Sequence, residues 1–264
     1  MDELAQFKAG QRQIWATFTP FELVTATTAP RLVGFAGVRA DQRVLDVGCG
    51  TGVVAVTAGR RGARVTGLDL TPELLQRASE NSAIAGVDIE WREGDAESLP
   101  FGDGAFDVVL SQFGHIFAPR PDVAVREMLR VLKPGGVIAF STWPPELCVG
   151  RLFVLLGRHL PPPPAFVSPP PQWGEPAIVR DRLGAAVRDI VFDPALMRVG
   201  TLSPAHYRIF FEGNAAPALR VVQALQNEPA RLAAFRREFE EIVGQFFEDN
   251  IIRQDYLLTR ATKV

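Results

Sequence analysis

The sequence predicts an α/β fold built on a doubly wound, mostly parallel sheet of seven strands, and three stretches predict it. Residues 44–52, Val-Leu-Asp-Val-Gly-Cys-Gly-Thr-Gly, join an apolar run to three alternating glycines, the pattern of a strand, a tight loop and a helix start. Residues 63–69 form a second strand pattern one helix later, which is the order of a parallel βαβ unit. The almost unbroken apolar run at 106–111 is typical of a strand buried on both faces.

The chain has 264 residues, enough for a sizeable core, and we expect one structural domain in three parts. Residues 1–40 should form a helical N-terminal segment and residues 41–145 the α/β core. Residues 146–264 should form a proline-rich connection and the last helix and strands of the core. Phenylalanine-rich helical segments at about 201–250 precede the final strand and should form a cap.

The composition argues against several classes of partner. A formal net charge of −2 gives no electrostatic reason to expect a nucleic acid, and no run of 18 apolar residues suggests a membrane span. Cys49 and Cys148 are the only cysteines, which argues against a disulfide framework and fits a cytoplasmic location. Neither these cysteines nor the three scattered histidines have the spacing of metal ligands, so we expect no metal site.

The N-terminal segment has a helical spacing of apolar residues from Leu4 to Phe18, and Pro20 ends the pattern. A second helix should start near Phe21 and break or restart at Pro30. One amphipathic face does not distinguish a helix that packs on the sheet edge from one that covers a ligand. Both roles therefore stay open for the apolar side chains of this segment.

The glycine loop should bind a ligand through its backbone. Glycine tolerates positive φ and has no Cβ, so a ligand can approach the chain closely at Gly48 and Gly50. The N-terminus of the following helix favours a negatively charged group. The spacing G-x-G-x-G differs from the dinucleotide fingerprint G-x-G-x-x-G, because Val53 stands where the last glycine would be. No lysine follows Gly52, so the sequence does not match a nucleoside triphosphate loop either.

Asp69 closes the second strand, where an acid can accept hydrogen bonds from both hydroxyls of a bound ribose. Its alternative role is a helix cap, but Thr71 and the following Pro72 already supply a cap and a first turn. A helix should follow and end at Gly86, before a short third strand at 89–92.

The rest of the chain continues the alternation of helices and strands. The phrase Lys-Pro-Gly-Gly at 133–136 should end a helix and reverse the chain. The prolines between residues 161 and 171 fix φ and cannot donate hydrogen bonds, so they predict extended connections. Helices are expected at 122–132 and 175–183, and strands at 137–142, 187–192 and 255–261.

Four motifs, in order along residues 44–142, resemble those of the class I S-adenosylmethionine-dependent methyltransferases. They are the loop at 45–52, Asp69, the Gly-Asp-Ala-Glu-Ser-Leu-Pro-Phe loop at 94–101 and the helix stop at 130–136. Within that family the sequence is most similar to the small-molecule enzymes of ubiquinone and menaquinone biosynthesis. The resemblance implies the Rossmann-like methyltransferase fold with an antiparallel last strand. It also implies S-adenosylmethionine as cofactor and S-adenosylhomocysteine as product.

The same resemblance implies roles for individual residues. Leu70 would lie against the adenine ring. Asp95 would accept a hydrogen bond from the exocyclic amine, and the Ala96 N–H would face a ring nitrogen. An N-terminal helix covers the cofactor in many relatives. The residues expected at the cofactor are Asp46, Gly48, Cys49, Gly50, Asp69, Leu70, Asp95, Ala96, Ser111, Gln112 and, from the N-terminal lid, Trp15.

The methyl acceptor should meet the cofactor beyond the strand at 106–111, since parallel α/β sheets bind ligands at the carboxyl ends of their strands. The aromatic cap suggests a small, partly apolar acceptor, methylated on oxygen, nitrogen or carbon by in-line displacement. If the acceptor must lose a proton, His115 or His206 could serve as the base. A structural role stays open for His115.

Two other functions stay open. A nicotinamide-dependent oxidoreductase is disfavoured by the glycine spacing. A non-catalytic protein that binds S-adenosylmethionine for regulation or assembly would carry the same motifs.

Overall fold

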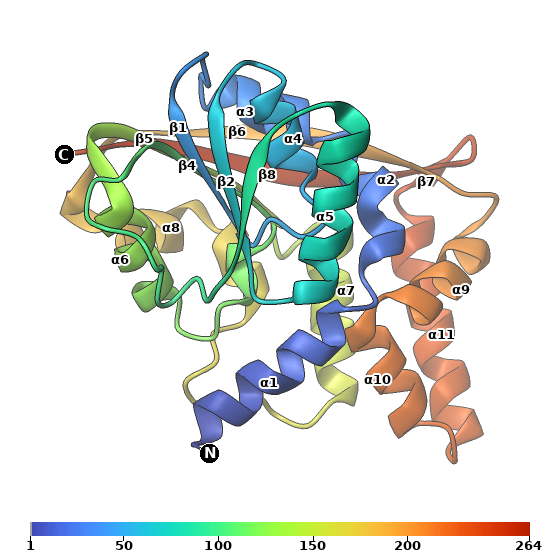
Figure 1. Cartoon of the computed structure of the whole chain (residues 1–264). Helices are drawn as coiled ribbons and strands as arrows, with labels where there is room; N and C mark the ends of the chain where they lie inside the picture. The colour runs from blue at the N-terminus through green and yellow to red at the C-terminus, as the bar shows by residue number, and fades with distance from the viewer. Residues whose placement is uncertain (1) are drawn as a thin grey trace.

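The structure, a computed structural model, describes residues 2–264 and shows one mixed sheet flanked by helices (Figure 1). Within these residues the strands are β1 (Arg43–Val47), β2 (Arg64–Asp69), β3 (Ile89–Glu93), β4 (Phe106–Gln112), β5 (Leu132–Thr142), β6 (Val187–Gly200), β7 (Phe247–Glu248) and β8 (Ile251–Lys263). The sheet order is β3-β2-β1-β4-β5-β8-β6, and β7 pairs with β8. Strands β1 to β5 pair in parallel, whereas β8 is antiparallel to both neighbours, β5 and β6. The predicted mostly parallel sheet with an antiparallel last strand is confirmed, with the short β7 added.

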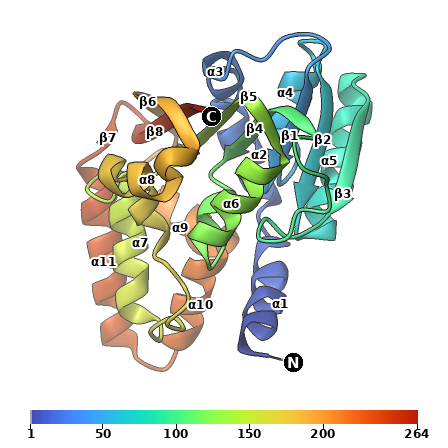
Figure 2. The same ribbon diagram turned by 90° about the vertical axis from the view of Figure 1, so that its left-hand side faces the viewer.

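Helices cover both faces of the sheet, as the doubly wound prediction requires (Figures 1 and 2). On one face, α3 (Ala29–Phe35) contacts α4 (Val53–Gly59), which contacts α5 (Pro72–Ala85). On the other face, α6 (Pro121–Val131) contacts α8 (Pro176–Leu183). The core lies between these layers, where β1, β4 and β5 bury most of their side chains.

The N-terminal segment is helical, as predicted, and its first part extends away from the sheet, whereas α3 packs against β4 and β5. It contains α1 (Glu3–Trp15), the 3-10 helix η1 (Thr19–Phe21) and α2 (Glu22–Ala26). Helix α1 contacts α10 (Ala216–Ala224) and lies beyond the carboxyl ends of the parallel strands (Figures 1 and 2). None of the α1 residues, all of which the structure describes, is buried. Helix α1 is therefore a surface element and adds little to the core.

Four helices pack together beside α1 at this end of the molecule (Figure 1). Helix α9 (Pro204–Asn214) contacts α10 and α11 (Pro229–Gly244), and these lie in the segment expected to form a cap. The fourth helix, α7 (Cys148–His159), contacts α10 and α11. Helix α7 was not predicted from the sequence, because prolines lie on both sides of it.

Two parts of the sheet differ from the prediction. Strand β5 begins at Leu132, so the Lys-Pro-Gly-Gly segment predicted as a turn belongs to the strand and lies where its register with β4 shifts. Strands β6 and β8 are about twice as long as predicted, because they pair with each other from Val187–Lys263 to Gly200–Ile251. Pro194 is tolerated within β6 because β6 is an edge strand, where a missing N–H need not break the sheet.

Candidate functional site

The loop between β1 and α4 needs its glycines for two reasons. Gly48, Gly50 and Gly52 have φ values of 64°, 54° and 81°, a backbone region that other residues rarely adopt. A Cβ on Gly48 would lie 2.9 Å from the Cα of Gly114, so these two backbones approach too closely for a side chain. A Cβ on Gly50 would meet no atom of the described chain within 4 Å. The backbone at Gly50 is therefore open on its outer side.

Asp46, near the end of β1, fixes the first turn of α4. One of its carboxylate oxygens accepts a hydrogen bond from the Ala55 N–H at 3.1 Å. The other oxygen, Oδ1, is buried and has no partner among the described residues. Burial, together with the negative charge of Asp69, raises the pKa of Asp46 to about 7. Since buried polar atoms are normally paired, Oδ1 is suited to a hydrogen bond from a ligand.

Asp69, at the end of β2, organises the glycine loop and the start of α5. Its carboxylate accepts hydrogen bonds from the Gly50 N–H at 2.8 Å and the Thr71 N–H at 2.9 Å. Burial raises the pKa of Asp69. Thr71 is the N-cap residue of α5, but its side chain makes no capping hydrogen bond, so the predicted capping role of that side chain is wrong. The carboxylate of Asp69 satisfies the amide of Thr71 instead.

The loop after β3 is tied to helix α1 by an ion-pair cluster. The Lys8 Nζ lies 2.6 Å from Asp95 Oδ2 and 2.6 Å from Glu97 Oε2. The Asp95 Oδ1 accepts a hydrogen bond from the Glu97 N–H at 2.8 Å. The side chain of Glu97 is fully buried and also pairs with Arg120 at 2.8 Å. Lys8 and Glu97 are not predicted from the sequence, since no local pattern links two residues so far apart in the chain.

Ser111 and Gln112, at the end of β4, have different surroundings. The Ser111 hydroxyl donates to the Val47 carbonyl at 2.6 Å and accepts from the His115 N–H at 3.0 Å, so it joins β4 to β1. Gln112 lines the cavity described below, and its Nε2 donates to the Thr25 carbonyl at 2.9 Å. Its Oε1 is buried and has no partner within the described chain.

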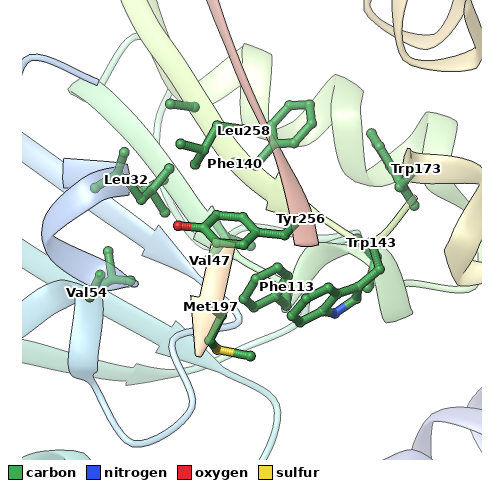
Figure 3. Packing of buried hydrophobic residues seen from close by; sticks show 14 of the residues in the cluster. Leu32, Val47, Val54, Phe113, Phe140, Trp143, Trp173, Met197, Tyr256 and Leu258 are labelled. Atoms are coloured by element: carbon green, nitrogen blue, oxygen red, sulfur yellow. The ribbon is translucent and has the colours of Figure 1, made fainter. Parts of the chain in front are cut away.

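Phe113 is held in a strained backbone conformation directly after β4. Its φ is 60°, which is unusual for a bulky side chain. The ring stacks on Trp143 with a centroid separation of 4.0 Å and an interplanar angle of 9°, and Tyr256 packs edge-on against it at 5.7 Å (Figure 3). Strained residues of this kind gather at ligand sites, where packing holds them in place. No sequence pattern indicated that Phe113 would be a strained residue of the candidate site.

The two histidines considered as bases lie away from the cavity. His115 is buried between Phe140 and Trp173, each with a centroid separation of 4.6 Å. Neither ring nitrogen of His115 has a partner among the described residues. Burial, with a smaller contribution from the charge of Arg182, lowers the pKa of His115 to about 3. His206 is exposed, and its Nδ1 lies 2.9 Å from the Thr201 hydroxyl oxygen.

These elements enclose one cavity of about 230 Å³ with two distinct ends. The polar end is lined by Asp46, Gly48, Cys49, Gly50, Asp69, Leu70, Asp95, Ala96 and Gln112. The apolar end is lined by residues of α7, β6, α9 and α10, and α1 to α2 close the side between the two ends. Trp15 belongs to this closing side and packs against Phe117 with a centroid separation of 4.4 Å. All the residues expected at the cofactor line the cavity except Ser111.

Two kinds of feature are absent from the part of the chain that the structure describes. No helix in residues 2–264 is long and apolar enough to cross a membrane. The same part of the chain contains no cluster of histidine, cysteine, aspartate or glutamate side chains that could bind a metal ion.

The chain is similar to proteins of known family. The family described as methyltransferase domain matches residues 45–140. An uncharacterized protein of Mycobacterium tuberculosis is 36% identical over 96% of this chain and 93% of its own length. Demethylmenaquinone methyltransferase of Thermus thermophilus is 38% identical over 117 residues, which cover 44% of this chain and 53% of that protein.

A solved structure shows the same fold. The crystal structure of a putative methyltransferase from Bacillus halodurans has a TM-score of 0.61 at 21% identity, covering 90% of this chain and 99% of that one. These findings favour a methyltransferase over the oxidoreductase considered above. The matched region contains the glycine loop, Asp69 and Asp95, which line one cavity. The chain belongs to the class I S-adenosylmethionine-dependent methyltransferases, with S-adenosylmethionine as methyl donor and S-adenosylhomocysteine as product.

Proposed function

We propose that this methyltransferase acts on a small, uncharged and partly apolar acceptor, which binds at the apolar end of the cavity. The observation that carries the proposal is the continuity of that cavity, which runs from Gly50 and Asp69 to Met197 and Phe211. When bound, S-adenosylmethionine supplies a methyl group activated by its sulfonium. The main task of the protein is placement, and correct placement can supply about 7 to 11 kcal/mol of a displacement barrier.

The polar end of the cavity fits the amino-acid and nucleoside parts of S-adenosylmethionine. The backbone at Gly50 is open, the buried Oδ1 of Asp46 lacks a protein partner, and the carboxylate of Asp69 lies at the end of β2. We assign the ribose hydroxyls to Asp69 and the adenine amine to Asp95. The remaining cofactor contacts in this proposal are Gly48, Cys49, Leu70, Ala96 and Gln112.

Helices α1 and α2, from the segment expected to form the lid, serve in this proposal as a lid over the cofactor, whereas α3 covers a face of the sheet. Trp15 lines the cavity and packs against Phe117, so it closes the space between the two ends. The pairing of Lys8 with Asp95 holds α1 against the loop assigned to the adenine. We assign Ser111 a supporting role, because its hydroxyl is used by the backbones of β1 and β4.

The apolar end of the cavity offers no general base. The ionisable side chains that line the cavity in the described chain are Lys8, Asp46, Cys49, Asp69 and Asp95 at the polar end or on α1, and Tyr207 at the apolar end. Burial raises the pKa of Tyr207, so its hydroxyl stays protonated near neutral pH and is not a base. His115 is assigned a packing role because it is buried outside the lining. The acceptor must therefore present an atom that is already nucleophilic near neutral pH.

Composition and burial also bear on the class of acceptor and on the cellular location in this proposal. The apolar end and a formal net charge of −2 support a small-molecule acceptor over a nucleic acid. Cys49 and Cys148 are buried free thiols, which supports a cytoplasmic location. The similarity to demethylmenaquinone methyltransferase extends over less than half of this chain, so it does not identify the acceptor.

The cofactor assignment is tested by calorimetric titration with S-adenosylhomocysteine. Asp69→Asn should weaken binding roughly 10- to 150-fold, because a hydrogen bond to a charged group contributes about 1.5 to 3 kcal/mol. The matched control is Asp88→Asn, since Asp88 is exposed and lies outside the cavity lining. Absence of heat with folded wild-type protein, or equal affinity of Asp69→Asn and the wild type, would contradict the assignment.

A further inference from the structure

Two buried polar side chains lie at the otherwise apolar end of the cavity. Tyr207 of α9 and Gln254 of β8 both line it and are 4% and 2% exposed. The Gln254 Nε2 donates a hydrogen bond to the Tyr207 hydroxyl oxygen at 2.8 Å. The other residues at this end are apolar, namely Phe113, Trp143, Val149, Phe153, Leu156, Met197, Phe211, Ala215 and Pro217.

The hydrogen bond between Tyr207 and Gln254 leaves the Tyr207 hydroxyl hydrogen, the second Gln254 Nε2 hydrogen and the Gln254 Oε1 unused. A tyrosine hydroxyl can still donate its own hydrogen, and the glutamine carbonyl oxygen, Oε1, can accept. Within residues 2–264, neither group makes a further hydrogen bond. Burial raises the pKa of Tyr207, so its hydroxyl remains a donor at neutral pH. Because buried polar groups are normally paired, this donor and acceptor are suited to one ligand group that provides both functions.

We propose that Tyr207 and Gln254 bind a hydroxyl group of the methyl acceptor, and that the acceptor is an uncharged molecule with a flat, aromatic body. This inference rests on the proposed function, which places the acceptor at the apolar end. A hydroxyl pairs with both side chains at once, since it accepts from Tyr207 and donates to the Gln254 Oε1. A carbonyl group can only accept, so it would leave the Gln254 Oε1 without a partner. A carboxylate would bring an unpaired charge into apolar surroundings, which is costly.

The shape of the molecule follows from the aromatic wall. The stacked pair of Phe113 and Trp143 lines one part of the apolar end, and Phe153 and Phe211 line another. Figure 3 shows Phe113, Trp143 and Met197 close together; Phe113 and Trp143 directly follow β4 and β5, and Met197 belongs to β6. Aromatic side chains pack favourably against a further ring, stacked or edge-on. A ligand with a flat ring system should therefore bind more tightly here than a branched or strongly polar one.

The charge preference follows from the cations near the cavity. Lys8 is the basic side chain in the lining of the described chain, and its Nζ already pairs with Asp95 and Glu97. No cation at the apolar end balances an anionic acceptor, so the structure favours a neutral hydroxyl compound over a carboxylate of the same size.

The test uses the full-length protein saturated with S-adenosylhomocysteine and three compounds of one shape: 5-indanol, indane and 5-indanecarboxylate. Isothermal titration calorimetry should give 5-indanol the highest affinity. Tyr207→Phe should weaken 5-indanol binding roughly 2- to 12-fold, the worth of about one hydrogen bond, and leave indane within about twofold. Gln254→Leu should have the same selective effect.

The matched control is Tyr256→Phe, which removes the hydroxyl of a tyrosine outside the cavity lining and should leave the wild-type preference for 5-indanol unchanged. Heat of S-adenosylhomocysteine binding in each variant reports the cofactor site separately, so its loss would implicate the proposed function and not the hydroxyl anchor. The anchor is refuted if Tyr207→Phe keeps the full preference for 5-indanol over indane. The proposed acceptor class is refuted if 5-indanecarboxylate binds as tightly as 5-indanol, or if the cofactor-loaded wild type binds none of the three.

Discussion

Replacing Lys8 by methionine should weaken cofactor binding while leaving the fold intact. Lys8 joins α1 to the loop assigned to the adenine, with its Nζ 2.6 Å from both Asp95 and Glu97. Helix α1 has no buried residue, and its other ion pair, Arg12 with Glu93, is exposed on both sides. Aromatic contacts of Phe7 with Phe166 and of Trp15 with Phe117 also hold α1, but the Lys8 contacts are the ones that tie it to the loop of Asp95.

The magnitude follows from the exposure of the partners. A pair on the open surface contributes about 0 to 1 kcal/mol, whereas hydrogen bonds between charged, buried groups contribute about 1.5 to 3 kcal/mol. The Lys8 and Asp95 side chains are 17% and 28% exposed and Glu97 is fully buried. The contribution of the Lys8 contacts should therefore lie between that of a surface pair and that of a buried charged hydrogen bond. Arg120 still pairs with Glu97 in the variant. We therefore expect Lys8→Met to reduce the free energy of cofactor binding by about 1 to 2 kcal/mol. This loss weakens S-adenosylhomocysteine binding roughly 5- to 30-fold.

Stopped-flow and calorimetric measurements on Lys8→Met would check this expectation. The loss of affinity should come mainly from a faster dissociation rate of S-adenosylhomocysteine, because an open lid releases the ligand. The thermal midpoint of the protein should change little. Lys133→Met is the matched control, since Lys133 also pairs with an aspartate, Asp107, at 2.6 Å but lies outside the cavity lining. Wild-type affinity and dissociation rate in Lys8→Met, or tighter binding through a released Asp95, would refute the reasoning.

Two further predictions concern the glycine loop and the buried histidine. Gly50→Ala should abolish binding of S-adenosylhomocysteine in titration, because the new Cβ enters the open side of the loop. Gly86→Ala is the control, since Gly86 at the end of α5 has a similar positive φ of 65°. It should reduce only the thermal midpoint, because it imposes similar backbone strain away from the cavity. His115→Leu should keep cofactor binding and turnover and should lessen the loss of stability in acid. The pKa of His115 is lowered from 6.5 to about 3 in the folded protein, so the unfolded chain takes up the proton first and wild-type stability falls as the pH drops through this window. Denaturant unfolding at pH 7 and pH 4 measures the difference, and an equal acid loss in both proteins would contradict the burial argument.

The sequence predicted the elements whose signals are local. The glycine loop, the acid at the end of β2 and the apolar run of β4 each combine residue types that allow few other structures, and β1 to β4 lie where they were expected. Helix α7 was missed because flanking prolines dominate the pattern around it. The extra length of β6 and β8 was missed because it depends on their pairing with each other, which one strand's own sequence does not reveal.

The same distinction holds for the candidate site. Asp69 and Asp95 stand out because the first ends a strand and the second follows one, each within a recognisable motif. Lys8 and Gln254 come from opposite ends of the chain, and only the folded arrangement brings them to one cavity. His115 was a reasonable candidate for a base by residue type and position, but a residue next to a cavity-lining loop can point its ring into the core.

The central claim is that one cavity holds the cofactor at the glycine loop and leaves its apolar end for the acceptor. A crystal structure of the protein grown with S-adenosylhomocysteine tests this most directly. We expect the ribose hydroxyls within hydrogen-bond distance of Asp69, the adenine beside Asp95, and the sulfur directed toward Gln112 and the apolar end. S-adenosylhomocysteine bound among Met197, Tyr207 and Phe211, or outside the cavity, would contradict it.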